Sequence, residues 1–366
     1  MIPFLELKST YTEIQEEIDS AVARVLESGW YILGPEVEAF EQEFAQFVGA
    51  VHCVGVGNGL DALVLALRAL EIGVGDEVVV PSNTYIATWL AVSMVGAKPV
   101  PVEPDPVTHC LDPARVEEAL TARTRAVMPV HLYGHPADLT SLHVLCERHG
   151  LRMIEDAAQA HGAAIAGRRI GACRDIVAWS FYPGKNLGAF GDAGAVTTND
   201  PQLARRIATL RNYGSSVKYV NNEKGTNSRL DPLQASVLRV KLKHLAAWNE
   251  RRQRIAQRYA QRLTGLPLEL PSVPEGFTHA WHLYVIVTSQ RDALQAHLTQ
   301  AGVGTLIHYP IPPFRQQAYS EFLPHAVRWP IADRLAHEVL SLPMGPHLTL
   351  GQADRVVDAL IDFYQR

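Results

Sequence analysis

The chain has 366 residues, of which 47 % are hydrophobic and 19 % charged, as is ordinary for a globular protein with a large core. Its 33 basic and 38 acidic residues are mixed without a basic stripe, so nucleic acid is not an expected partner. The apolar runs are strand-sized or broken by Gly and Pro, which indicates no membrane span.

The cysteines and the N-terminal segment exclude further classes. Cys53, Cys110, Cys146 and Cys173 lie far apart and form no C-x-x-C pair, which argues against a structural zinc site, an iron-sulfur cluster or a disulfide framework. The first residues, MIPFLELKSTYTEIQ, carry acids early and lack a long apolar core, unlike a signal peptide. We therefore expect a cytoplasmic protein with reduced thiols and no metal site.

The first sixty residues predict two amphipathic helices and then a buried strand. Apolar side chains recur at helical spacing over residues 11–28 and again after Gly34-Pro35. The strand VHCVGV runs into Gly57-Asn58-Gly59 and a further helix, and such a turn exposes backbone amides at the positive end of the helix dipole. This suits a phosphate group, although glycine also serves such turns for steric reasons. Asp61 would repel a phosphate, so we expect it to cap the helix or to meet a neighbouring group.

Strand and helix patterns alternate through about the first two hundred residues, which predicts a mainly parallel sheet covered by helices. Tyr85 follows a strand end in the loop SNTY, where it would either stack on a flat ring or pack against a helix. His131 ends another strand and is either a ligand-side residue or a satisfied structural histidine.

Asp156 ends the strand in LRMIEDAAQAHGA, and open α/β sheets bind their ligands at the carboxyl ends of parallel strands. Lys185 lies on a short loop between the apolar strands of DIVAWSFYPGKNLGAFGDAGAVTT. A lysine framed in this way is a candidate for Schiff-base chemistry, because lysines normally stay hydrated at the surface. Pyridoxal phosphate needs such a lysine and a carboxylate for its ring nitrogen, and this pair supplies both. The alternatives are a helix cap or ion pair for Asp156 and a solvated loop lysine.

The second half of the chain gives weaker signals. Residues 213–231 form a long polar segment in which Asn227 and Arg229 are placed to reach a phosphate or a carboxylate, or which is simply a surface loop. A long helical stretch from residue 232 leads into a second domain, so we expect domains at 1–240 and 241–366. His308, Tyr309 and the following prolines form a rigid loop that would cover a substrate.

Nearly the whole chain resembles the DegT/DnrJ/EryC1/StrS sugar aminotransferases. The motifs that carry the resemblance are GWYILGPEVEAFE, PSNTYIATWLAV, VHLYG, IEDAAQAHGA, SFYPGKNLGAFGDAGAV and the Asn-x-Arg of TNSR. VGNGLDAL, SFYPGKN and HYPIPP are most similar to the 3-aminotransferases of nucleotide-linked 3-keto-6-deoxyhexoses. The resemblance implies an α/β protein of fold type I with pyridoxal phosphate as cofactor. Its large domain would hold a mainly parallel, seven-stranded-type sheet, and its smaller C-terminal domain would be α+β.

The resemblance also implies residue roles. Lys185 would carry the cofactor as an imine and move protons, and Asp156 would pair with the pyridine nitrogen. Tyr85 would stack on the ring, and Gln159 would lie beside its hydroxyl. Asn227 would reach the phosphate of a neighbouring subunit, which implies a homodimer with shared sites. The remaining positions are Gly57, Asn58, Gly59 and Ser180 at the phosphate, and Tyr182, Arg229, His308 and Tyr309 near the substrate.

The chain departs from the pattern of many relatives at two places near the expected cofactor site. Many relatives have Ser-Gly-Thr at Gly57-Asn58-Gly59, so backbone amides would supply more of the phosphate grip here. Many also have Gly-Glu-Gly-Gly where residues 191–194 read Gly-Asp-Ala-Gly, a change shared with the 3-aminotransferase subgroup. The implied reaction transfers an amino group from L-glutamate to the C3 keto group of a dTDP-linked 3-keto-6-deoxyhexose. Amination at C4 or another carbon, elimination, and a non-catalytic regulator that binds the cofactor are alternatives. Dehydratase relatives replace the lysine by histidine, so Lys185 speaks against dehydration.

Overall fold

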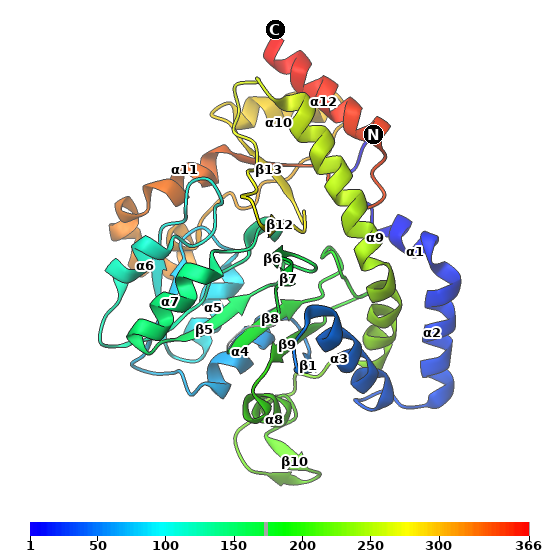
Figure 1. The fold of residues 1–366 in the computed structure, drawn as a ribbon, viewed down its shortest axis with the longest axis vertical. Helices are drawn as coiled ribbons and strands as arrows, with labels where there is room; N and C mark the ends of the chain where they lie inside the picture. Colours follow the sequence, from blue (N-terminus) through cyan, green and yellow to red (C-terminus); the bar gives the residue numbers. More distant parts are fainter. Residues whose placement is uncertain (172–174, 366) are drawn as a thin grey trace.

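The computed structural model describes residues 1–171 and 175–365, so Cys173 lies outside the described residues. At its centre is a seven-stranded sheet with the order β1-β9-β8-β5-β4-β2-β3 (Figure 1). Only β9 runs antiparallel to its neighbours, and the mainly parallel seven-stranded sheet expected from the sequence is thereby confirmed. The strands are β1 (His52–Val56), β2 (Glu77–Pro81), β3 (Lys98–Val102), β4 (Thr124–Val127), β5 (Arg152–Asp156), β8 (Ile176–Ser180) and β9 (Gly194–Thr198).

Helices cover both faces of the sheet because successive strand residues point to opposite sides. Val78 and Val80 pack into one core, while Val79 between them packs into another. The first core is covered by α4 (Gly59–Ala69), α5 (Ile86–Met94) and α8 (Pro201–Leu210). The opposite face is covered by α3 (Pro35–Val48), α6 (Pro113–Ala119), α7 (Leu139–His149) and the first part of α9 (Pro232–Leu263).

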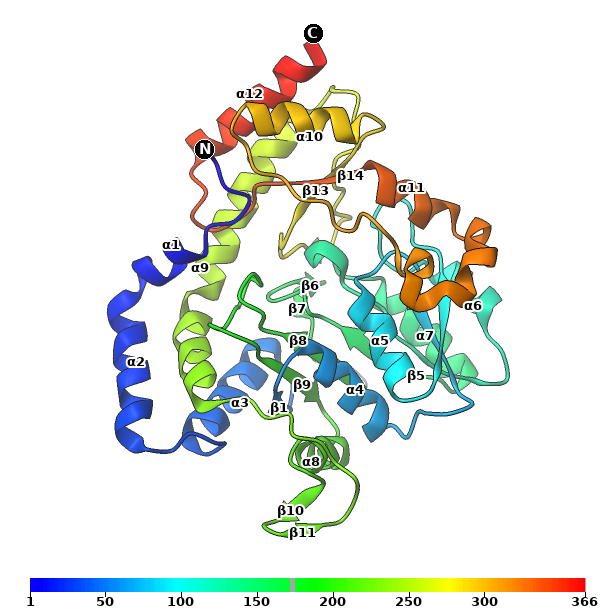
Figure 2. The same ribbon diagram turned by 180° about the vertical axis from the view of Figure 1, so that it is seen from behind.

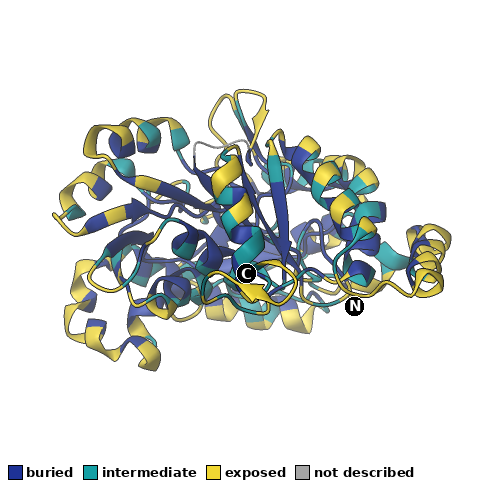
Figure 3. Cartoon of the chain, turned by 90° about the horizontal axis from the view of Figure 1, so that it is seen from below, coloured by how far each residue is buried: buried dark blue, intermediate teal, exposed yellow. Residues whose placement is uncertain are grey.

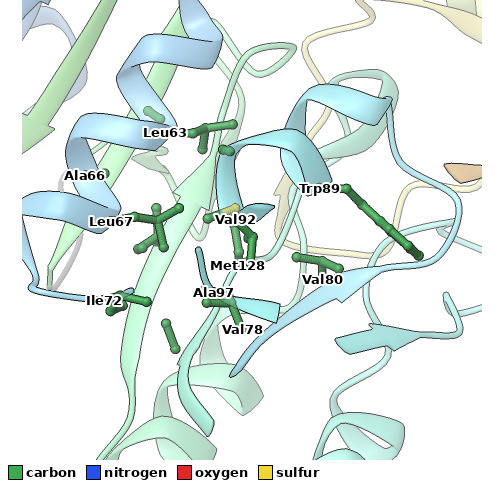
Figure 4. Packing of buried hydrophobic residues seen from close by; sticks show 14 of the residues in the cluster. Leu63, Ala66, Leu67, Ile72, Val78, Val80, Trp89, Val92, Ala97 and Met128 are labelled. Atoms are coloured by element: carbon green, nitrogen blue, oxygen red, sulfur yellow. The ribbon is translucent and has the colours of Figure 1, made fainter. Parts of the chain in front are cut away.

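Burial follows this layering. The strands of the seven-stranded sheet are mostly buried, whereas the covering helices have exposed outer faces (Figure 3). In the first core, Leu63 and Leu67 of α4 gather with Val78 and Val80 of β2 and with Trp89 of α5 (Figure 4). The long apolar runs of the sequence thus form buried strands, which is typical of parallel sheets.

The N-terminal helical segment is divided in two. The sequence pattern predicts one helix over residues 11–28, but the structure has α1 (Leu7–Glu13) and α2 (Gln15–Ser28). Ile14 separates them with φ −125° and ψ 29°, which is outside the helical region. Ile14 and Ile18 are buried against α9, so packing fixes the bend that periodicity alone does not reveal.

The C-terminal part is built around the 32-residue helix α9, which continues from the large sheet past residue 240. Here β13 (Tyr284–Val287) pairs with β14 (Val339–Leu342), and α10 (Arg291–Gln300) and α12 (Leu350–Gln365) share its core. Both termini lie at this end of the molecule (Figure 2). A division at residue 240 would cut α9, so the two-domain division remains a proposal.

Another C-terminal segment packs on the large sheet's helices. The short 3₁₀ helices η2 (Pro313–Arg315) and η3 (Gln317–Arg328) and the helix α11 (Pro330–Glu338) lie here. Phe314, Tyr319, Phe322 and Trp329 from this segment join the core of α4 and α5. The C-terminal third is therefore tied to the large sheet as well as to its own small core.

The remaining elements are short. β6 (Ala164–Ile165), β7 (Arg168–Arg169) and β12 (Phe277–Thr278) form a small three-stranded sheet, and η1 (Leu132–Gly134) follows β4. The polar segment expected to be a loop contains the hairpin β10 (Ser215–Val217) and β11 (Val220–Asn221). This hairpin projects from the molecule below α8 (Figure 2). None of the helices within residues 1–171 and 175–365 is long and apolar enough to cross a membrane.

Trp89 allows a test of the first core. Its side chain is fully buried, its Nε1–H donates to the Pro81 carbonyl at 2.9 Å, and its ring packs against Tyr319 and Phe322. We expect Trp89→Ala to lower the free energy of unfolding by about 3–5 kcal/mol, measured by urea denaturation with circular dichroism. Val144→Ala, at an exposed position of α7, is the control and should change it by less than about 0.5 kcal/mol. Equal losses in both variants would contradict this view of the core.

Candidate active site

Asp156 and Lys185 meet at the carboxyl ends of two adjacent parallel strands. Asp156 is the last residue of β5 and pairs in register with Ala178 of β8. Lys185 follows β8 on a turn in which its backbone N–H donates to the Tyr182 carbonyl at 2.8 Å. The carboxylate of Asp156 is buried and Lys185 is half-buried, so neither the surface ion pair nor the solvated loop lysine describes them.

The carboxylate of Asp156 is fixed by two hydrogen bonds. Its Oδ2 accepts from the Thr88 hydroxyl at 2.9 Å, and its Oδ1 accepts from the Ala158 N–H at 3.2 Å. Burial raises the pKa of Asp156, while these two donors and the charge of Lys185 partly oppose that rise. A positive group beside this carboxylate would be strongly favoured, because the acid is already desolvated.

The amine of Lys185 is made reactive by its surroundings. Burial lowers the pKa of Lys185 to about 8, although the charge of Asp156 favours the protonated form. Burial lowers the pKa of His161, His282 and His308, and the nearby charge of Lys185 lowers the pKa of each imidazole further. Lys185 and Asp156 influence one another without forming a direct ion pair.

Gln159 connects the end of β5 to the C-terminal part of the chain. Its Oε1 accepts from the Tyr133 N–H at 2.5 Å, and its Nε2 donates to the Tyr309 hydroxyl at 3.1 Å. The ring of Tyr309 lies 5.2 Å from that of Tyr85, and the Tyr133 hydroxyl donates to the His308 carbonyl. The structure therefore brings the loop of residues 308–309 to the edge of the sheet that holds Asp156.

The turn before α4 presents its amides beside Ser180. Asn58 caps α4, because its Oδ1 accepts from the Asp61 N–H at 2.8 Å. A Cβ atom at Gly59 would lie 2.6 Å from the Cβ of Ser180, so this close approach requires glycine. The first-turn amides of a helix have no partner within the helix and attract anions.

Ser228 connects this turn to the segment that contains Asn227. Its hydroxyl accepts from the Gly57 N–H at 3.0 Å and donates to the Asp61 carboxylate at 2.6 Å. The expectation that Asp61 meets a neighbouring group is confirmed. The Gly57 N–H already donates to Ser228, so a phosphate would be bound by the backbone amides that follow Gly57 and by Ser180.

These residues fit pyridoxal phosphate. A buried acid lies at the end of β5 for the ring nitrogen, a half-buried amine lies on the turn after β8, and helix amides lie beside Ser180 for the phosphate. Tyr85 adds an aromatic ring that is 54 % exposed and therefore has a face available. Each polar group that the cofactor requires thus has a counterpart.

Comparison with known proteins agrees with this geometry. Residues 12–361 match the model of the DegT/DnrJ/EryC1/StrS aminotransferase family. This chain belongs to that family. The family, the fold type and the cofactor expected from the sequence are confirmed, and the chain is an aminotransferase of this group.

Two similar proteins and one solved structure illustrate the match. The "dTDP-3-amino-3,4,6-trideoxy-alpha-D-glucose transaminase" of Streptomyces venezuelae is 56 % identical over 100 % of this chain and 97 % of its own. The "Erythromycin biosynthesis sensory transduction protein EryC1" of Saccharopolyspora erythraea is 58 % identical over 98 % of each chain. The crystal structure of S. venezuelae DesV with a ketimine intermediate superposes with a TM-score of 0.99 at 56 % identity, covering 100 % of this chain and 99 % of that one.

Three of the site residues predicted from the sequence either lie away from Lys185 in the single chain or face solvent. Asn227 is exposed and pairs with Asn212 through a backbone bridge. Arg229 donates to the Asn212 Oδ1 at 3.2 Å, and Tyr182 is 59 % exposed. Their roles stay predictions, and that of Asn227 requires a second subunit.

Sequence reasoning missed three supporting residues. Thr88 bonds Asp156, and its only signal is one hydroxyl in the apolar helix IATWLAV. Asn186 donates to the Ala280 carbonyl at 2.7 Å and to the Asn249 Oδ1 at 3.1 Å, which no local pattern reveals. Tyr133 holds Gln159 through a backbone N–H, which depends on tertiary structure alone.

The role of His131, which the sequence left open, is structural. The side chain is fully buried, its Nδ1 accepts from the Ala137 N–H at 3.0 Å, and its Nε2 lies 3.1 Å from Glu155.

The lowered pKa of Lys185 is testable on the protein freed of cofactor. Because the neutral amine is the nucleophile, modification of Lys185 by an amine-reactive reagent should accelerate with pH around a midpoint of about 8. Peptide mass spectrometry would measure the rate, with the exposed Lys243 as an internal control for reagent and peptide recovery. Asp156→Asn should move the midpoint lower, since the carboxylate stabilises the ammonium. A midpoint for Lys185 near about 10.4, the ordinary value for a lysine, would refute the assignment.

Proposed function

We propose that this chain transfers the amino group of L-glutamate to the C3 keto group of a dTDP-linked 3-keto-6-deoxyhexose. The observation that carries the proposal is the buried Asp156 facing the activated amine of Lys185 at adjacent strand ends. The name of the S. venezuelae relative, which specifies a dTDP-3-amino sugar, supports the substrate class and the C3 position.

Asp156 and Lys185 would carry different parts of the reaction. Bound pyridoxal phosphate supplies an electron-accepting ring and a carbonyl carbon that takes up the amino group. Asp156 would hold a proton at the ring nitrogen, where its desolvated carboxylate favours a positive partner. The Nζ of Lys185 takes the proton from the α-carbon of glutamate and later delivers a proton to C3 of the sugar. A pKa of about 8 suits both tasks, since a proton shuttle works best near the ambient pH.

Other groups would orient the partners and exclude water. Gln159 and Tyr309 form a hydrogen-bonded pair at the edge of the site, and Tyr85 lies against Tyr309. The amides that begin α4 would hold the phosphate together with Ser180. His308, whose Nδ1 lies 2.8 Å from the Ser341 hydroxyl, would form the wall near the sugar.

We also propose a cytoplasmic homodimer with shared sites. The projecting hairpin exposes apolar side chains in the single chain, with Tyr219 89 % and Val217 64 % accessible. A second exposed apolar group consists of Leu26, Trp30, Tyr31 and Ile32. Such surfaces are typical of association sites, and they agree with the outward position of Asn227 beside the hairpin.

A regulatory function is the second candidate, because the 58 % identical relative is named a sensory transduction protein. A sensor would need to hold the cofactor but would not need a proton shuttle. The activated amine of Lys185 therefore favours catalysis over sensing. Amination at C4 differs only in how the sugar is presented to the same amine.

The visible spectrum of the purified protein tests both half-reactions. The band of the bound cofactor should disappear when glutamate is added and return when a dTDP-linked 3-keto-6-deoxyhexose follows. Lys185→Ala should lower the rate by at least about 10²- to 10⁴-fold, the usual worth of acid–base catalysis alone. A band that glutamate leaves unchanged would support the regulatory function, and product mass with NMR would locate the aminated carbon.

Mixed dimers test the shared site. Lys185→Ala and Asn227→Ala homodimers should each be impaired, but a heterodimer between them would contain one intact site if Asn227 serves the neighbouring subunit. We expect the exchanged mixture to be more active than either parent. The matched control mixes Lys185→Ala with Asp156→Asn, whose residues share one chain, so no intact site forms. Equal behaviour of the two mixtures would refute the shared site.

A further inference from the structure

Lys241 of α9 is a second buried lysine close to the turn that carries Lys185. It is 4 % exposed, and its Nζ donates to the Gly188 carbonyl at 2.6 Å. The ammonium also lies 4.2 Å from the ring centroid of Phe190. Within residues 1–171 and 175–365, no carboxylate forms an ion pair with it.

A buried ammonium without an opposite charge is unfavourable for stability. Burial lowers the pKa of Lys241 to about 8, with no neighbouring charge to compensate. A methionine would occupy a similar volume without this penalty. Lys241 forms no ion pair that would stabilise the fold. Its role is therefore inferred from its hydrogen bond to the Gly188 carbonyl.

Gly188 closes the turn on which Lys185 lies. A Cβ atom at Gly188 would lie only 2.4 Å from the Pro183 carbonyl oxygen, so the two backbone segments touch across the turn. The Lys185 N–H donates to the Tyr182 carbonyl, and the Ala189 N–H donates to that of Phe181 at 2.7 Å. A group that fixes the Gly188 carbonyl therefore fixes both ends of the turn.

The same helix holds the turn at another place. Asn249, two turns further along α9, accepts from Asn186, the residue after Lys185. Asn249 also donates to the His161 carbonyl at 2.8 Å, which anchors it to the segment after β5. Helix α9 thus holds the turn at two residues that follow Lys185, at Asn186 through Asn249 and at Gly188 through Lys241.

We propose that Lys241 is a positioning residue, which holds the Gly188 carbonyl and thereby aims the amine of Lys185 at the reacting carbon. The proposal rests on the role of Lys185 given above. In this role Lys241 acts through the Gly188 carbonyl and not by contact with the substrate or the cofactor. Its ammonium can donate more strongly than a neutral group to the carbonyl, which a hydrophobic replacement cannot do.

The test compares Lys241→Met, Lys241→Arg and the matched control Lys243→Met, an exposed lysine of the same helix. We expect Lys241→Met to lower kcat by about 100-fold, the effect of a misplacement of about 1 Å, with the KM of both substrates nearly unchanged. Lys241→Arg keeps the donor and should restore part of the activity. Lys243→Met should behave like the unaltered protein.

Two readouts do not depend on turnover. In the cofactor-free protein, the rate at which an amine reagent modifies Lys185 should change in Lys241→Met but not in Lys243→Met. The thermal midpoint of Lys241→Met should stay close to that of the unaltered protein, because removal of a buried charge offsets loss of the hydrogen bond to the Gly188 carbonyl. An unchanged kcat and modification rate would overturn the proposal. A raised KM for the sugar nucleotide at constant kcat would also overturn it and would assign Lys241 to substrate binding.

Failure of the proposed function is distinguishable from this outcome. If Lys185 were not the catalytic lysine, Lys185→Ala would retain activity whatever Lys241 does. If Lys241→Met failed to fold, Lys241→Arg would still test the proposal, because the arginine keeps a donor to the Gly188 carbonyl. Loss of Lys185 reactivity in a Lys241→Arg protein with a normal thermal midpoint would contradict a role through that donor.

Discussion

A buried carboxylate and a half-buried ammonium at one edge of a sheet are the constraint on which the structure depends. An isolated buried carboxylate or ammonium is costly, and each is tolerated here because the other lies nearby and because fixed donors surround Asp156. Only the parallel register of β5 and β8 brings a residue at the end of one strand beside the turn that follows the other. The apolar cores on both faces maintain that register, so the packing of the sheet is a condition of the chemistry.

Helix α9 connects this local arrangement to the rest of the molecule. It begins beside the large sheet, holds the Lys185 turn through Lys241 and Asn249, and ends in the core of the C-terminal part. The loop of residues 308–309 comes from that part and reaches Gln159, which follows Asp156 in the same segment. One rigid element therefore connects the Lys185 turn to the C-terminal core, which a loop could not do with the same accuracy.

The sequence predicted what depends on local pattern. Strand ends, the glycine turn before α4 and the lysine between apolar strands follow from periodicity and residue chemistry, and these identified Asp156 and Lys185. The break at Ile14, the Thr88 bond and the Tyr133–Gln159 bond were missed because each arises from packing between distant segments. The hairpin within residues 213–231 was missed because its strands are two and three residues long and mostly polar or exposed. The polar segment singled out Asn227, but its predicted role at a neighbouring subunit came from the resemblance alone, since one chain does not contain a subunit interface.

One similar relative is named a transaminase and the other a sensory transduction protein. The energetic cost of burying the lysines of this chain bears on the choice between these two functions. A protein that only senses pyridoxal phosphate could hold it through the helix amides and Asp156, and a lysine with an ordinary pKa would suffice for a stable covalent link. This chain instead desolvates Lys185 enough to lower its pKa to about 8 and places Lys241 buried and without a counter-ion behind the same turn. Both features are unfavourable for the stability of the fold. A desolvated amine forms an imine and transfers protons more readily, so the stability that these two lysines cost is an argument for a reactive amine at this turn, independent of any name given to a relative.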